Sequence, residues 1–408
     1  MRVVRGISQS LSIALLLLTC RALSAQKATV EPTPQTQSEP SPIPAAGPLA
    51  EPKSIKQVGV PVEATRGAVL EDNPQTQEKI ALGEKLFFDG RLSVDKTVAC
   101  STCHDPARAF TDGRPVSIGV NGRVGQRNAP TVLTRFTTRR SSGMGVQAFR
   151  NVFGRPPSGP DLVRAIASYE RTQFSFDSPF DHFIAGDQNA ISESAKRGWE
   201  LFNTRARCNK CHALTEEKRD ATYFTDNDFH NIGIGIIRHD VVALACKAEQ
   251  LVNSGDATAI DHAAIQTNMS ALGRFLITKK DADIASFKTP DLRNVLITAP
   301  YFHDGSQETL WDVMDHYNKG DGIHNPYLDE DIQPLALTEA EIDDVVAFLA
   351  TLTSAQYAEQ GAKELARQRA LSRTNRPQRD TGRAFGPKPV QPSASRSCVG
   401  VPSKAERK

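Results

Sequence analysis

The sequence predicts a mainly α-helical protein built from two similar domains, and three observations support this. A Cys-x-x-Cys-His box occurs twice, at residues 100–104 and 208–212. A Gly-x-x-Leu-Phe string precedes each box, at residues 83–87 and 198–202. Apolar residues at helical spacing lie on both sides of each box. A helix, a loop and a box that recur in this order indicate an internal repeat, so we expect two domains packed together.

Each box predicts the covalent attachment of one haem. Two thiols one helical turn apart can bond the two vinyl groups of a haem, and the adjacent histidine can bind its iron. A structural zinc site is the other use of such a cysteine pair, but the repeated full box favours haem. The residues that would hold the two haems are Cys100, Cys103 and His104, and Cys208, Cys211 and His212. Each histidine should donate its other ring N–H to a carbonyl or carboxylate.

The two ends of the chain are expected to lie outside the folded domains. Residues 1–25 have the basic start, short apolar run and small-residue cleavage site of a secretory signal peptide, which predicts export to the periplasm. Residues 26–60 form a Pro/Gln-rich linker that we expect to be disordered. Residues 354–408 carry 12 basic and 4 acidic side chains, which predicts a basic disordered tail. A short helix over 357–370 is an alternative for part of this tail.

The folded part is predicted as an N-terminal domain over residues 61–187 and a C-terminal domain over 188–353. Apolar periodicity predicts four helices, over residues 77–88, 161–174, 309–317 and 338–352. Added helices are expected between residues 241 and 277. No stretch after the signal is apolar enough to span a membrane.

Charge and the remaining cysteines indicate the surroundings of the protein. The body between signal and tail is net acidic, which would attract a basic redox partner, although a solvated acidic surface is the simpler explanation. Nothing in the sequence points to nucleic acid. Outside the two boxes and the signal only Cys246 and Cys398 remain, and we expect both to be free thiols because Cys398 lies in the predicted tail.

The ordered motifs of residues 70–353 resemble the bacterial di-haem cytochrome c peroxidase and MauG family. They include Ala-Phe-Thr-Asp-Gly at 109–113, Arg-Asn-Ala-Pro-Thr at 127–131, Thr-Pro-Asp-Leu-Arg-Asn at 289–294 and Pro-Tyr-Phe-His-Asp-Gly at 300–305. The resemblance implies two cytochrome-c-like domains. The first haem would meet hydrogen peroxide, and the second would relay electrons from a soluble cytochrome c or a small copper protein. The resemblance leaves a homodimer open.

The resemblance also implies ligands beyond the boxes. Tyr317 falls where peroxidase relatives have a methionine ligand and MauG-type relatives have a tyrosine, which makes it the expected second ligand of the His212 haem. Met314 and His316 are rivals on the same predicted helix. A hard tyrosinate ligand favours higher oxidation states of iron.

The first iron is expected to keep an open position. Relatives often carry a blocking histidine in the loop after the first box, and Val120 stands at that position here. The family also holds a calcium ion between its domains, and the matching residues are Asn128, Thr298 and Pro300. Oxygen ligands of this kind suit calcium.

One segment departs from the family pattern. Relatives place a Trp-Asp-Gly-Arg-Ala motif and the polar lining of the peroxide pocket after the position of Thr131, and this chain lacks them. The catalytic residues are therefore unknown, with Gln126 and Arg123 as candidates because they are polar and near. Met144 is an alternative ligand to the first iron.

The leading hypothesis is a periplasmic di-haem oxidoreductase that reduces hydrogen peroxide with electrons from a small redox protein. The first alternative is a MauG-like high-valent di-haem oxidase that acts on a protein or cofactor, which Tyr317 favours. The second is a non-catalytic di-haem electron-transfer cytochrome, which the missing pocket segment favours.

Overall fold

The computed structural model describes residues 73–133, 146–156, 158–173, 175–212, 223–255, 268–320 and 325–380. The predicted signal peptide and linker lie outside this range, as do Met144, Cys398 and the last part of the tail. Within the described residues no helix is both long and apolar enough to cross a membrane.

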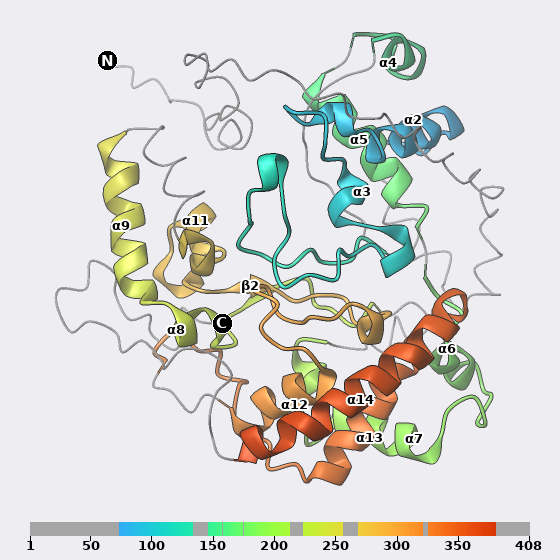
Figure 1. Cartoon of the computed structure of the whole chain (residues 1–408), viewed down its shortest axis with the longest axis vertical. Coiled ribbons are helices and arrows are strands. Elements are labelled where there is room, and N and C mark those ends of the chain that lie inside the picture. The colour runs from blue at the N-terminus through green and yellow to red at the C-terminus, as the bar shows by residue number, and fades with distance from the viewer. Residues whose placement is uncertain are drawn as a thin grey trace, which may run out of the picture.

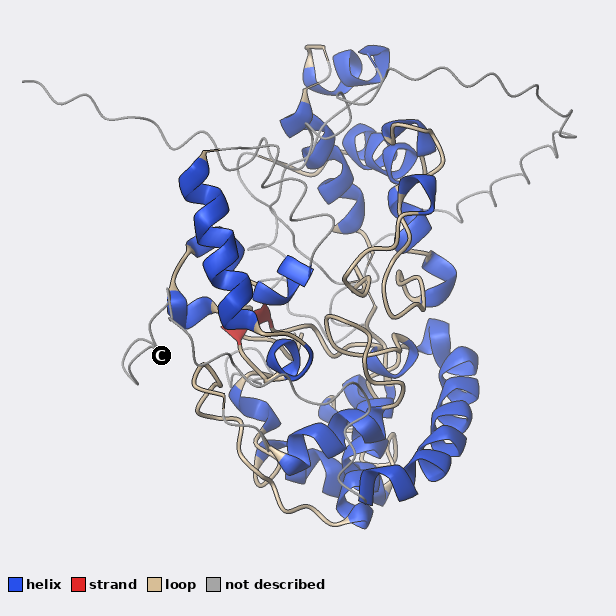
Figure 2. Ribbon diagram, turned by 60° about the vertical axis from the view of Figure 1, so that its left-hand side comes forward, coloured by secondary structure: helices blue, strands red, loops and turns tan. Residues whose placement is uncertain are grey.

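The described chain is mainly helical, as predicted. Figure 2 shows helices throughout the described residues, with very short strands between them. Strands β1 (Phe229–His230) and β2 (Phe287–Lys288) pair antiparallel. The helices are α2 (Gln77–Phe87), α3 (Cys100–Cys103), α4 (Val146–Phe153), α5 (Gly159–Glu170), α6 (Pro179–Ile184), α7 (Glu193–Asn203), α8 (Ile234–Arg238), α9 (Val241–Ser254), α11 (Phe275–Thr278), α12 (Leu310–Lys319), α13 (Glu339–Ala350) and α14 (Ala358–Asp380).

The N-terminal lobe is built on the pair α2 and α5, which lies at the top of Figure 1. Both predicted helices are confirmed. Helix α2 begins after Thr76, whose side chain accepts from the Lys79 amide, and α5 begins after Ser158 in the same way. The helices cross at Gly83, where a β-carbon would lie 1.9 Å from the Ala165 carbonyl oxygen.

The C-terminal lobe repeats this arrangement with α7 and α13. A capping box starts α13, because the Thr338 hydroxyl accepts from the Glu341 amide while the Glu341 carboxylate accepts from the Thr338 amide. These helices cross at Gly198, where a β-carbon would again lie 1.9 Å from a carbonyl oxygen, that of Asp344. The structure therefore confirms the internal repeat in three dimensions.

Helix α6 packs in the C-terminal lobe. Its fully buried Phe180 contacts the rings of Trp199 and Phe348. The Arg293 guanidinium, with no exposed area, pairs with Asp181 of α6 at 2.8 Å. The predicted boundary at residue 187 therefore differs from the structure, in which the C-terminal lobe already begins with α6.

Helix α14 corrects the predicted tail. The prediction of disorder from residue 354 is wrong for residues 354–380, which contain a long helix against the C-terminal lobe (Figure 1). Gln368 is fully buried, accepts from the Leu310 amide at 2.8 Å and donates to the Leu296 carbonyl at 2.9 Å. Composition did not predict this because only one narrow face of the helix is buried and the rest is strongly charged.

A third group of helices, α8, α9 and α11, has its own apolar core and stands at the left of Figure 1. The predicted added helices are thus confirmed for the described part of 241–277. The prediction of a free thiol at Cys246 is wrong, because this α9 residue is disulfide-bonded.

The two lobes are joined by direct hydrogen bonds. The Asn128 amide donates to the His303 carbonyl at 2.8 Å, and the Tyr357 hydroxyl donates to the Pro106 carbonyl, next to the first box, at 3.2 Å. Arg127 donates to the Ser270 carbonyl at 3.0 Å. The loops that follow the first box are therefore held against the C-terminal lobe.

The helix crossings give a first prediction. We expect Gly83→Ala and Gly198→Ala each to lower the free energy of unfolding by about 1–3 kcal/mol, because the added methyl group would collide with backbone that cannot move aside. Gly119→Ala is the control, since the nearest atom to its β-carbon is 3.8 Å away. Denaturant unfolding of the haem-loaded variants measures the effect. Equal stabilities of all three variants would contradict it.

Candidate haem sites

The first box lies on the short helix α3. Cys100 and Cys103 are one turn apart, both are free thiols and both are partly buried. The His104 amide donates to the Cys100 carbonyl at 3.0 Å, which ends the helix at the histidine. Burial raises the pKa of Cys100 to about 11, so the thiol is protonated at neutral pH. The local fold thus presents two thiols and a histidine from five consecutive residues.

The loop after the first box orients His104. Its Nδ1 donates to the Phe110 carbonyl at 3.1 Å. Ala109 and Phe110 both have left-handed backbone angles, with φ of 51° and 59°, which turn this carbonyl towards the ring. The Phe110 amide bonds the Asp105 carbonyl at 2.7 Å and closes the loop. A carbonyl oxygen can only accept, so the proton lies on Nδ1 and Nε2 carries the lone pair for iron.

The second box repeats this geometry. His212 Nδ1 donates to the Phe224 carbonyl at 2.6 Å, and Phe224 is fully buried with a left-handed φ of 53°. Burial lowers the pKa of His212, which favours the neutral imidazole that a metal requires. The prediction that each box histidine donates to a carbonyl is confirmed in both lobes.

Helix α12 brings Tyr317 towards the second box. Burial first, and then the nearby sulfurs of Cys211 and Cys208, raise the pKa of Tyr317 well above its ordinary value. The helix begins with a capping box between Thr309 and Asp312, and it was predicted over residues 309–317. The phenol therefore lies near both thiols of the box.

The two rivals of Tyr317 have other partners. Met314 is 3% exposed and belongs to the main apolar core. The Nε2 of His316 donates to the Ile232 carbonyl at 2.9 Å, and burial lowers the pKa of this histidine. Of the two titratable residues, Tyr317 is the one whose pKa the box sulfurs shift.

The loop expected to cover the first haem forms a small hairpin. The Gly119 amide bonds the Arg123 carbonyl at 2.8 Å, and Val120 begins a short 3-10 turn. Arg123 is exposed, and the Gln126 side chain accepts from the Ser270 hydroxyl at 2.9 Å. The segment after residue 133, where relatives have their pocket motif, lies largely outside the described range.

Of the three predicted calcium ligands, Asn128 lies in the joint between the lobes. Asn128 is held by its backbone to His303, and its side-chain amide donates to the Arg114 carbonyl at 2.7 Å. Gly305 packs so closely that a β-carbon there would lie 2.2 Å from the Pro115 α-carbon. Thr298 and Pro300 belong to the same segment of the C-terminal lobe.

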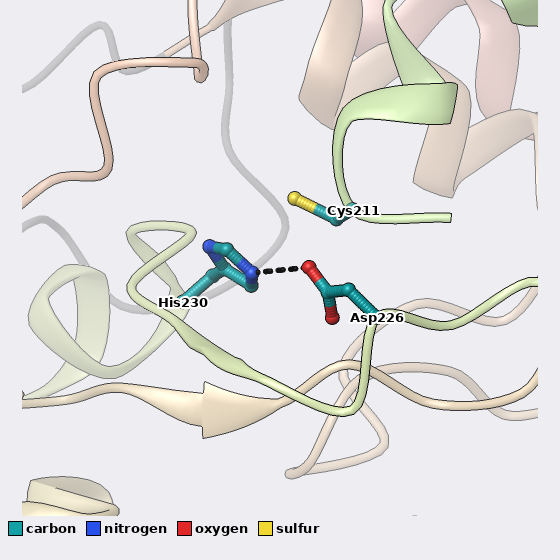
Figure 3. A group of neighbouring side chains, drawn as sticks. All are labelled: Cys211, Asp226 and His230. Atoms are coloured by element: carbon teal, nitrogen blue, oxygen red, sulfur yellow. Dashed lines mark hydrogen bonds and ion pairs between the residues drawn. The ribbon is translucent and has the colours of Figure 1, made fainter. Parts of the chain in front are cut away.

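Sequence reasoning missed a cluster beside the second box. His230 bonds both Asp226 and Asp329. The Cys211 sulfur lies within 4.8 Å of ligand atoms of His230 and Asp226. Figure 3 shows Cys211, Asp226 and His230 side by side. Asp329 is 99 residues from His230 in the sequence, so no local motif predicts that the two side chains pair. A thiol, a carboxylate and an imidazole at this spacing resemble a metal site, but a box cysteine bonded to haem is a thioether and no longer a thiolate ligand.

Comparisons with known proteins agree with this geometry. A family model for the di-haem cytochrome c peroxidases matches residues 77–144 and 134–189. Cytochrome-c peroxidase IdrP1 of a Pseudomonas species is 33% identical over 331 residues, which cover 71% of this chain and 84% of the relative. Methylamine utilization protein MauG of Methylorubrum extorquens is 33% identical over 318 residues, or 69% and 79% of the two chains.

This chain belongs to the di-haem cytochrome c peroxidase and MauG family. The crystal structure of a MauG-like protein associated with microbial copper homeostasis aligns with a TM-score of 0.53 at 29% identity, covering 70% of this chain and 92% of that one. The family consists of oxidoreductases with two c-type haems. The residues present fit this assignment, because each lobe offers two thiols one turn apart and a histidine already oriented by a carbonyl.

Proposed function

We propose that this family member reduces hydrogen peroxide at the His104 haem, with electrons that arrive through the His212 haem. The haems, when bound, supply peroxide cleavage and electron storage. Each peroxide takes up two electrons and two protons and leaves as two water molecules. The chain holds the two groups in separate lobes that are tied together by direct hydrogen bonds.

The two box histidines lie in similar sites with different surroundings, and this difference is the main support for the proposal. Both histidines are oriented by a carbonyl, but the second box has the Tyr317 phenol beside its thiols. Val120, at the position where relatives can have a blocking histidine, cannot ligate iron. A peroxidase with two haems needs this inequality, because one iron must admit peroxide while the other passes electrons without reacting.

We further propose a small soluble cytochrome c or copper protein in the periplasm as the electron donor. Acidic residues beside the second box support a basic partner. Asp329, Glu330 and Asp331 follow one another there, and Asp331 pairs with Arg207, directly before Cys208, at 2.5 Å. A donor over this loop would reach the His212 haem first.

A MauG-like oxidation of another protein or cofactor is the second candidate function. Tyr317 favours it, because a tyrosinate would stabilise the oxidised states of the second iron. Electron transfer without catalysis is the third candidate. It is favoured by the sequence after Thr131, which lacks the family's usual pocket motif.

Rapid mixing with peroxide distinguishes the three candidates. After mixing with peroxide, we expect the absorption spectrum of the haem-loaded protein to change. The protein should then oxidise two molecules of reduced cytochrome c per peroxide, as the electron balance requires. A spectral change without oxidation of cytochrome c would favour the MauG-like function. No response to peroxide would leave only electron transfer.

The matched controls for this experiment are the two box variants. Cys100→Ala with Cys103→Ala removes the first attachment site, and Cys208→Ala with Cys211→Ala removes the second. The first pair should abolish the reaction with peroxide. The second pair should allow peroxide to react but should stop the transfer of electrons from cytochrome c.

Tyr317→Phe tests the proposed ligand of the second haem. We expect altered absorption and electron-spin spectra of that haem alone, because phenylalanine cannot bind iron. Tyr301→Phe is the control: this tyrosine is buried in the same lobe, but its hydroxyl bonds the Leu296 carbonyl and Gln368. A second haem whose spectra are identical in Tyr317→Phe and the wild type would refute the ligand.

A calcium ion held by Asn128, Thr298 and Pro300 is the remaining part of the proposal. It is supported by the resemblance and by the position of Asn128 in the joint between the lobes. Metal analysis of the purified protein should find one calcium per chain in the wild type and none in Asn128→Ala. Protein that lacks calcium and retains full activity would contradict this.

A further inference from the structure

His230 is held between two carboxylates at the edge of the second haem site. Its Nδ1 lies 2.6 Å from Asp329 Oδ2, and its Nε2 lies 2.9 Å from Asp226 Oδ2. Figure 3 shows His230 and Asp226 converging beside the Cys211 sulfur. The side chains of His230, Asp226 and Asp329 are 20%, 25% and 14% exposed, so the cluster is shielded more than an ordinary surface ion pair.

The geometry determines the charge of this histidine. A carboxylate oxygen only accepts, so both ring nitrogens must carry protons to satisfy their partners. The hydrogen bond with Asp329, followed by contributions from Cys211 and Asp226, raises the pKa of His230 to about 11. The Cys211 contribution ends when its sulfur becomes a thioether, but both carboxylates remain. Burial raises the pKa of Asp329 and the bond with His230 lowers it more, so this carboxyl stays ionised.

Backbone bonds tie the cluster to the haem site. The Asp226 amide donates to the Cys211 carbonyl at 2.9 Å, and the Asp329 amide donates to the Asn231 carbonyl at 3.0 Å. Asn231 is 3% exposed and donates to the Ile284 carbonyl at 2.8 Å. Asp226 also follows Phe224, whose carbonyl orients His212, by two residues. The backbone of both aspartates is therefore held by hydrogen bonds, one of them to the second box itself.

We infer that His230, Asp226 and Asp329 form a permanent charged cluster, with a net charge of −1, that tunes the reduction potential of the His212 haem. A cluster with a net charge of −1 near the haem stabilises the oxidised iron more than a neutral site would. It stabilises the oxidised iron less than the two carboxylates would without the positive charge of His230. His230 acts through its electrostatic field at the haem and by holding its loop in place. It does not touch the reacting atoms. The inference rests on the family's second haem and does not require peroxide to be the substrate.

Potentiometric titration of the purified di-haem protein tests the cluster at a pH of about 5.5, where His230 stays protonated with Asp226 as its remaining carboxylate partner. Asp329→Asn makes the cluster neutral and should raise the potential of the second haem. His230→Gln leaves two carboxylates and should lower it. We expect each change to alter the reduction equilibrium about tenfold, or roughly 59 mV for a one-electron couple.

The two variants should shift the reduction potential in opposite directions, which distinguishes an electrostatic effect from a loss of structure. A merely structural role would give shifts of the same sign, or none, and either result would overturn the inference. The first haem is an internal reference whose potential should stay unchanged. His182→Gln is the matched control, because His182 pairs with Asp177 at 2.9 Å but is 57% exposed. It should leave both potentials unchanged.

Haem content of two per chain and an unchanged unfolding midpoint establish that each variant is folded before its potentials are compared. The potentials can be measured whether or not the protein turns over peroxide. A failure of the proposed peroxidase function and a failure of this inference are therefore separate results.

Discussion

The hydrogen bond between each box histidine and the carbonyl of a following phenylalanine is the constraint on which both haem sites depend. A histidine can bind iron productively only if its ring is held in one tautomer and one orientation. His104 and His212 meet this need through Phe110 and Phe224, which adopt left-handed backbone angles of 59° and 53°. Such angles are unfavourable for a bulky residue, so the buried rings and the closed loop around each carbonyl must maintain them.

The helix pairs that pack against the box loops explain how these strained backbone angles are maintained. Each lobe crosses two helices at a glycine, Gly83 or Gly198, and the close approach packs the phenylalanine of the preceding Gly-x-x-Leu-Phe string beside the box loop. The similarity of the lobes ends at α12, which serves only the second box. In the proposed function, Tyr317 on this helix would supply the difference between the two haem sites that an electron relay requires.

Two groups that bear on the charge of the second site lie near Cys211: the neutral Tyr317 phenol and the cluster of His230 with two carboxylates. As a tyrosinate bound to iron, Tyr317 would stabilise the oxidised state. The net negative cluster would do the same, and the positive charge of His230 would limit its effect. The potential of this haem decides whether electrons pass from the donor or are withdrawn from another substrate. The same surroundings therefore bear on the choice between a peroxidase and a MauG-like function.

The sequence by itself determined the haem boxes, the internal repeat, most helix starts and the family. These features depend on neighbouring residues, as a capping box or five consecutive haem-binding residues do. Tertiary structure decided the features that join distant residues. Asp329 bonds His230, which lies 99 residues away in the sequence. The buried Gln368 bonds the Leu310 amide and so holds a charged segment, which was predicted to be disordered, as a packed helix. The disulfide of Cys246 also escaped prediction, because pairing depends on where the fold brings two cysteines together and not on their spacing.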